Sequence, residues 1–74
     1  MEDVVKRRRE LEEKIVNAQR GLRERDPDHH LLRLVEVDGM GINWTAEFGR
    51  YYEGMIVYEG LSNYAADLEH ALEE

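Results

Sequence analysis

The sequence predicts one small α+β domain over residues 1–74, with a long N-terminal helix, a three-stranded antiparallel meander and a short C-terminal helix. Two amphipathic segments with helical periodicity at the ends, and an alternating segment bounded by glycines between them, predict this order. A chain of 74 residues buries only about 60% of its unfolded surface, so its stability margin is thin. Because the chain has no cysteine, packing or association with a partner is the expected support rather than a disulfide.

The first helix is predicted over residues 2–25, where apolar side chains recur at spacings of seven, four, three and four and form one stripe. These residues are Val4, Leu11, Ile15, Ala18 and Leu22. Oppositely charged pairs four residues apart occupy the polar face. Asp26 and Pro27 end the helix, because a residue before proline disfavours helical geometry. Gly21 either caps the regular helix early or sits inside it at a cost of about 1 kcal/mol.

The middle of the chain is predicted as three strands, 31–37, 42–48 and 52–58. Asp38-Gly39-Met40-Gly41 is a hairpin signal between the first two, and Gly49-Arg50-Tyr51 supplies the second turn. Segment 42–48 alternates without an error, and the third strand is expected in the register that extends its apolar face. That face consists of Ile42, Trp44, Ala46, Phe48, Tyr52, Ile56 and Tyr58.

The last helix is predicted to begin after Gly60, which breaks the third strand, with Ser62 as its N-cap. One side of this helix is apolar, and consists of Tyr64, Ala65, Leu68, Ala71 and Leu72. Both helices are expected to pack across the Trp44 face of the sheet and to bury the only tryptophan.

The opposite face of the predicted sheet carries four apolar residues, Leu32, Leu34, Met55 and Val57. This is more apolar surface than a small monomer usually exposes. It is therefore a candidate homodimer interface, and the alternative is that the C-terminal helix covers it.

Charge is divided unevenly along the chain. Residues 1–25 hold eight basic and six acidic side chains, net +2, whereas residues 26–74 hold two basic and eleven acidic side chains, net −9. The whole chain carries a formal charge of −7. Such a separation determines which partners the surface attracts and repels.

Composition excludes several classes of protein. At 42% hydrophobic and 36% charged residues, the chain is expected to fold rather than to be disordered. Its apolar runs are shorter than the roughly 20 residues that cross a bilayer, and its N-terminus predicts a charged helix rather than a signal peptide. We therefore expect a cytoplasmic protein with no membrane contact.

The residues that catalysis or metal binding requires are sparse. His29 and His30 lie near Asp26 and Asp28, but the spacing matches no zinc or nickel motif, and a solvated turn is the expected structure. The hydroxyl groups are those of Thr45, Ser62 and the tyrosines, and the glycines at 39 and 41 do not form a phosphate loop. We expect no enzyme activity, no metal and no cofactor.

The leading hypothesis is a non-enzymatic protein-interaction module that binds a basic surface, most simply as an inhibitor of a nucleic-acid-handling protein. Carboxylates of the acidic part favour association with a positive groove, and tyrosine is a frequent interface anchor. The candidate contacts are Glu36, Glu47, Tyr51, Glu53 and Glu59. In composition the chain resembles small phage inhibitors of host defence or nucleic-acid enzymes, which implies action in the cytoplasm of a host cell.

Two alternative functions are also consistent with the sequence. One is a homodimeric DNA-binding regulator whose basic helix contacts phosphates through Arg7, Arg8 and Arg9. The acids that follow these bases count against direct binding of nucleic acid. The other is a structural subunit in which the stripe of the first helix forms a coiled-coil seam, although Arg8 occupies a seam position.

Overall fold

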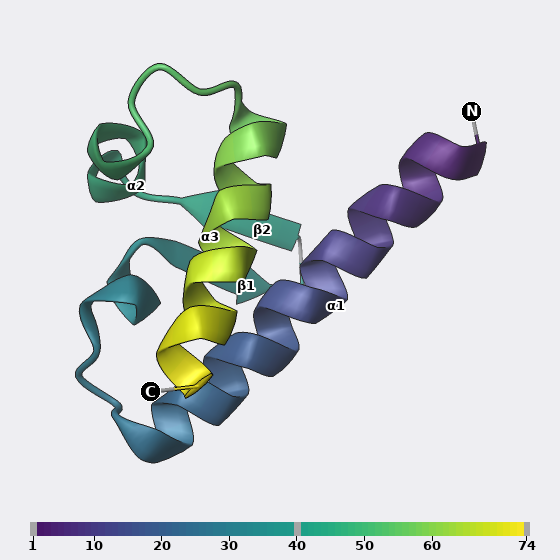
Figure 1. The fold of residues 1–74 in the computed structure, drawn as a ribbon. Helices are drawn as coiled ribbons and strands as arrows, with labels where there is room; N and C mark the ends of the chain where they lie inside the picture. Colours follow the sequence, from purple (N-terminus) through teal and green to yellow (C-terminus); the bar gives the residue numbers. More distant parts are fainter. Residues whose placement is uncertain (1, 40, 74) are drawn as a thin grey trace.

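The computed structural model describes residues 2–39 and 41–73, with side chains from residue 5 onward. Met40 of the hairpin signal and the side chain of Val4 lie outside what it describes. The elements in chain order are α1 (Glu2–Arg25), the 3-10 helix η1 (His30–Arg33), β1 (Val35–Asp38), β2 (Gly41–Trp44), α2 (Ala46–Tyr51) and α3 (Val57–Glu73). The chain is thus an α+β fold with a long helix, a two-stranded antiparallel sheet and a C-terminal helix (Figure 1).

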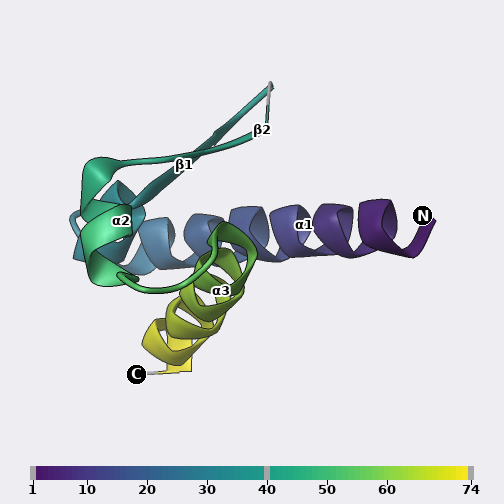
Figure 2. The same cartoon turned by 90° about the horizontal axis from the view of Figure 1, so that it is seen from above.

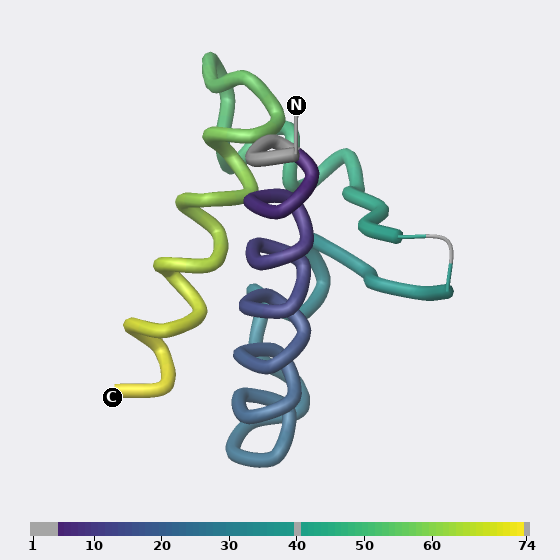
Figure 3. Tube along the Cα trace, turned by 90° about the vertical axis from the view of Figure 1, so that its right-hand side faces the viewer, coloured from purple at the N-terminus to yellow at the C-terminus, as the bar shows by residue number. Residues whose placement is uncertain are grey.

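Helix α1 lies between the β-hairpin and α3, as Figures 2 and 3 show from two directions. Its predicted bounds are confirmed. Gly21 sits inside the helix, and a Cβ atom at this position would lie 3.2 Å from Leu72 Cδ2. The glycine therefore allows α1 and α3 to approach closely, and Arg25 adds a hydrogen bond to the Leu72 carbonyl.

The core forms where α1, α3 and the short elements meet. Its buried apolar residues are Ile15, Ala18, Leu22, Leu31, Leu34, Val35, Phe48, Tyr52, Leu61, Tyr64, Ala65 and Leu68. The predicted apolar stripe of α3 packs into or against this cluster along its whole length.

The predicted hairpin is confirmed, but its first strand is shorter than the alternating pattern indicates. Strands β1 and β2 pair antiparallel, with Val35 opposite Trp44 and Val37 opposite Ile42. Residues 30–33 form η1 instead of strand, because His29 Nδ1 accepts a hydrogen bond from the Leu31 amide at 3.2 Å and caps this turn. Leu31 consequently enters the core rather than a sheet.

The prediction of strand over 42–48 is wrong from Thr45 onward. Thr45 Oγ1 accepts a hydrogen bond from the Phe48 amide at 3.3 Å, and this N-cap starts α2. The same hydroxyl donates to the Leu34 carbonyl at 3.1 Å, which fixes the cap against the chain before β1. Capping at Thr45 thus determines the local structure despite the alternating pattern, and Phe48 becomes a buried residue of α2.

The predicted third strand, 52–58, is also wrong, since the described part of the chain has only β1 and β2. Gly54 adopts a φ of +86°, a left-handed conformation that reverses the chain between α2 and α3. Helix α3 then begins at Val57, so Ser62 is an exposed residue inside the helix rather than its N-cap. Gly60 is buried in the first turn, where a Cβ atom would lie 3.1 Å from Phe48 Cζ.

Because residues 46–48 and 57–58 are helical, neither face of the predicted sheet forms. Trp44 is not buried, since half of its surface is exposed. Of the four residues predicted as a dimer face, Leu34 is buried and Leu32 packs against the core. Met55 and Val57 are exposed between α2 and α3 and at the start of α3. The four residues therefore share no surface.

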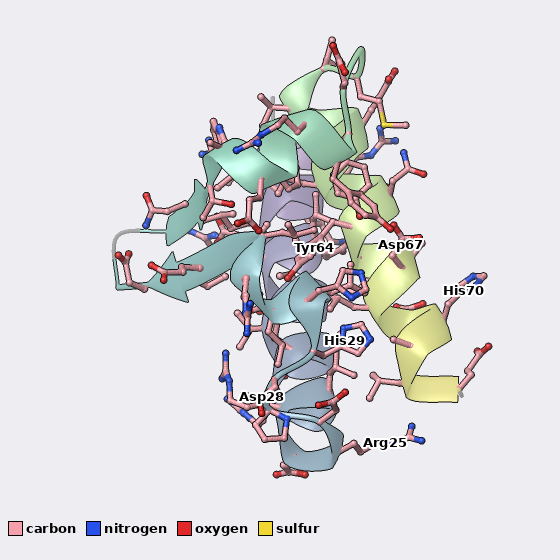
Figure 4. All side chains as sticks on the ribbon, turned by 90° about the vertical axis from the view of Figure 1, so that its left-hand side faces the viewer. Arg25, Asp28, His29, Tyr64, Asp67 and His70 are labelled. Carbon is pink, nitrogen blue, oxygen red and sulfur yellow. The ribbon has the colours of Figure 1, made fainter. Side chains whose placement is uncertain are left out.

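A buried polar cluster holds the core together. Gln19 Nε2 donates to the Val35 carbonyl and to Tyr64 Oη, each at 2.9 Å, and Tyr64 Oη donates to the Leu31 carbonyl at 2.6 Å. Figure 4 shows Tyr64 projecting from α3 toward the segment that contains η1. Burial raises the pKa of Tyr64, so its hydroxyl stays protonated and available as a donor.

A second phenol joins α2 to α3. Tyr52 Oη donates to Asp67 Oδ2 at 2.6 Å. Burial and, next, this hydrogen bond to a carboxylate raise the pKa of Tyr52 far above its usual range. Tyr52 ends α2, so this bond fixes α2 against α3.

Candidate functional site

Several large apolar side chains remain exposed, among them Tyr51 on α2. Trp44 and Tyr58 are each 50% exposed, and Val57 is 43% exposed. Val5, Met55 and Ile56 are likewise exposed. Scattered exposed apolar residues are normal, but a contiguous patch marks a binding surface.

Several of these side chains line one groove, with a volume of about 340 Å³. Its walls come from three elements that are distant in sequence: the first half of α1, strand β2 and the first turns of α3. The lining residues are Arg8, Leu11, Glu12, Ile42, Trp44, Val57, Tyr58 and Leu61. Most of these side chains are apolar, and Arg8 and Glu12 of α1 are the charged ones.

The groove forms because the apolar stripe of α1 extends beyond the core. Ile15 of this stripe is fully buried, whereas Leu11, one turn earlier, is only partly buried. In Figures 1 and 2 the N-terminal part of α1 extends past the body of the molecule. The groove lies where β2 and the start of α3 flank residues 8–12 of α1.

Trp44 belongs to the groove because of the hairpin register. Side chains of directly paired residues lie on the same face of a sheet, so Trp44 shares a face with its partner Val35. Val35 is 1% exposed and lies in the core, whereas Trp44 lies at the edge of the core and contacts Phe48, with 6.5 Å between ring centroids. One side of the indole is therefore packed, and the remainder is open to solvent.

The charged residues of the groove are weakly engaged with each other. Arg8 Nε lies 4.0 Å from Glu12 Oε1, and the Arg8 side chain is 80% exposed. An exposed pair of this kind contributes little stability. Both side chains are thus available to contact a partner that enters the groove.

The five predicted partner contacts are exposed, and they are spread over several elements rather than along one sheet. Glu36 lies on β1, Glu47 and Tyr51 lie on α2, Glu53 follows α2, and Glu59 lies in the first turn of α3. Glu47 and Tyr51 are brought together, since they line a shallow hollow that also includes His30. Without a third strand, the remaining three residues lie on β1, in the loop after α2 and on α3.

The three predicted phosphate contacts, Arg7, Arg8 and Arg9, are exposed on the projecting part of α1. Arg8 faces the groove, as its place in the lining shows. Acidic residues 10, 12 and 13 follow at once on the same helix.

The histidine-containing turn forms no metal centre among residues 2–39 and 41–73, where no group of three or more His, Asp or Glu side chains converges. The rings of His29 and His30 stack at 4.7 Å, and His29 uses Nδ1 to cap η1. His70 points away from His29, on the outer side of α3 (Figure 4).

The sequence pattern does not predict the groove, because it predicts that Ile42, Trp44 and Tyr58 are buried in a sheet face. A signal for the correct structure is present in Thr45, a good N-cap residue that follows Trp44 and has an acid at the second helical position. It predicts that the strand ends at Trp44 and leaves the indole at the end of a short hairpin.

No helix in the described residues is long and apolar enough to span a membrane. No protein-family model matches the chain, and no curated protein or solved structure matches it significantly.

Proposed function

We propose that this protein is a non-enzymatic protein-interaction module that binds an amphipathic helix with basic residues in the groove. The observation that carries the proposal is the half-exposed Trp44, held beside Val57 and Tyr58 in the groove wall. Aromatic residues in a partly desolvated pocket are typical energetic centres of protein interfaces.

A helix suits this groove in shape and chemistry. Two of the walls are helices, and apolar helix faces bind other proteins by lying in a hydrophobic groove. The lining offers apolar contacts from Leu11, Ile42 and Leu61 in addition to the aromatic side chains. A partner that presents one apolar stripe therefore covers the exposed surface without burying its own polar side.

Charge determines which helix is favoured. The chain carries a formal charge of −7, so a partner with basic flanks is attracted over long range. We assign this attraction to the exposed acids Glu36, Glu47, Glu53 and Glu59. They lie on separate elements and accelerate the encounter rather than form the contact. A basic nucleic-acid-handling protein, the partner class that composition favours, fits this requirement.

The test is the binding of a synthetic helical peptide of leucine and lysine, about 14 residues or four turns long, with all leucines on one stripe. A fluorescent label on the peptide reports binding by anisotropy. We expect saturable binding that a peptide of the same composition with dispersed leucines does not show. Equal binding of the two peptides would contradict the proposal.

Two matched variants locate the site. Tyr58 lines the groove, whereas Tyr51 lies outside it on α2, and the two side chains are 50% and 55% exposed. Tyr58→Asp and Tyr51→Asp add the same charge and remove the same ring. We expect the peptide affinity to fall about tenfold or more in Tyr58→Asp and to stay near that of the unsubstituted protein in Tyr51→Asp. The reverse result would move the site to the hollow beside α2.

A further inference from the structure

The chain itself contains an exposed helical segment that is rich in basic residues. In the part of α1 that projects beyond the body, every side chain from residue 5 to residue 10 is exposed. This segment carries the exposed apolar Val5 and the four consecutive bases of residues 6–9. A second copy of the protein therefore offers a basic helical segment with an apolar position.

The order of charges along α1 favours an antiparallel pairing of two copies. Bases occupy residues 6–9, and acids follow at positions 10, 12 and 13. When two such helices lie antiparallel, the basic turns of each face the acidic turns of the other, whereas parallel helices bring like charges together. A contact with two-fold symmetry uses the same surface on both copies, so this complementarity occurs twice.

The accessible surface area of the chain is larger than that expected of a compact monomer, as it would be if a partner covered part of it. The protein exposes 5655 Å², whereas a compact monomer of its mass is expected to expose about 4,700 Å². The excess is comparable to the roughly 800 Å² that each partner buries in a standard interface. The projecting part of α1 and the open groove beside it both add to exposed surface.

We infer that two copies of this chain pair about a two-fold axis, with the N-terminal part of α1 from each copy lying antiparallel in the groove of the other. This inference rests on the proposed function and places a second copy in the same groove. Because both copies carry a net charge of −7, the attraction is confined to the basic segment of α1 and the acids that it faces. Val5 of each copy covers the apolar lining, and Arg8 of each copy pairs with Glu12 of the other. In this arrangement the arginines of α1 face acids, which disfavours their use as phosphate contacts.

Charge exchange at Arg8 and Glu12 tests the pairing directly. In a pair of Arg8→Glu chains, the new acid at position 8 of each copy faces Glu12 of the other. In a pair of Glu12→Arg chains, the new base at position 12 of each copy faces Arg8 of the other. By sedimentation equilibrium of the full chain at low salt, we expect the unsubstituted protein to be dimeric and each single variant to dimerise at least about tenfold more weakly. An equimolar mixture of the two variants is expected to form a heterodimer, because each supplies the charge that the other lacks. The double variant Arg8→Glu/Glu12→Arg is expected to regain dimerisation.

Dimerisation in the mixture distinguishes a contact between two copies from an effect of the substitution within one chain. Each single variant also loses the weak Arg8–Glu12 pair inside α1, but mixing leaves that loss unchanged. Circular dichroism of each variant confirms that α1 is retained. Dimers of equal strength in all variants would place the contact elsewhere and overturn the inference.

The outcomes also distinguish this inference from the proposed function. A protein that stays monomeric at the highest concentration, yet binds the leucine–lysine peptide in the groove, overturns self-association and leaves the proposed function standing. A monomer that binds no peptide overturns both. A dimer that Tyr58→Asp does not weaken overturns the inference, because the pairing then does not use the groove.

Discussion

The two halves of α1 have the same amphipathic character but different surroundings. In the C-terminal half, Ile15 and Leu22 are 0% and 2% exposed and belong to the core. In the N-terminal half, Leu11 is only partly buried, and Arg8 occupies the position that faces the groove. The apolar stripe is therefore longer than the core that this chain builds, and its free end forms a wall of the groove.

The largest expected difference between the halves is in stability. Leu22→Ala removes a fully packed side chain, and we expect it to lower the free energy of unfolding by about 2–5 kcal/mol. Leu11→Ala removes the same atoms from a partly solvated site, and we expect a loss below about 1 kcal/mol. Urea denaturation measures both values. Equal losses would show that Leu11 belongs to the core and that the groove is not an open surface.

The buried polar cluster is the next most sensitive feature. Tyr64→Phe removes the shorter of the two hydrogen bonds that the Leu31 carbonyl accepts, since the Leu34 amide donates the other at 3.3 Å, and it leaves Gln19 with one partner fewer. We expect a loss of about 1–3 kcal/mol in the free energy of unfolding. Tyr51→Phe, which removes a hydroxyl from an exposed ring, is the control and should change stability by less than about 0.5 kcal/mol. A neutral Tyr64→Phe would show that the cluster does not hold β1 and η1 against the helices.

High pH is expected to weaken the link between α2 and α3. The folded-state pKa of Tyr52 is raised above its unfolded value near 10, first by burial and then by the hydrogen bond to Asp67. The unfolded chain therefore loses this proton first, so stability is fully present below about pH 10 and falls as the pH rises above it. Tyr52→Phe should flatten this decline in urea denaturation series recorded at increasing pH. An unchanged slope would assign the decline to other groups.

The smallest expected effect concerns the dispersed acids. Reversing two of them in Glu47→Lys/Glu53→Lys should slow association with the basic peptide several-fold at low salt and leave the dissociation rate nearly unchanged. Stopped-flow measurements at two salt concentrations separate the two rates. Faster dissociation, of the size seen in Tyr58→Asp, would show instead that these acids form part of the contact.

Local sequence patterns predicted the helices better than the strands. The bounds of α1 followed from its apolar period and from Pro27, which act within a few residues. For residues 46–48 the alternating pattern was misleading, because Thr45 offers a helix cap whose geometry is completed by the distant Leu34 carbonyl. The start of α3 was misplaced because Gly60 is tolerated in a helix where it admits the ring of Phe48.

Local sequence patterns could not predict the groove, for a physical reason. Its walls come from residues 8–12, 42–44 and 57–61, which come together only after the chain has folded. Whether Trp44 is covered depends on where the first turns of α3 lie relative to α1 and β2, and that is a property of tertiary packing. That a small chain without disulfides needs further support stays a prediction.

Trp44 itself provides the most direct test of the account, because it is the only tryptophan and is half exposed in the groove wall. The measurement is its emission spectrum, together with quenching by acrylamide, as the leucine–lysine peptide is added. If the groove binds a helix, the emission shifts to the blue and quenching falls, because the exposed side of the indole loses water. Saturable binding with neither change would contradict the central claim that the groove is the surface this protein uses.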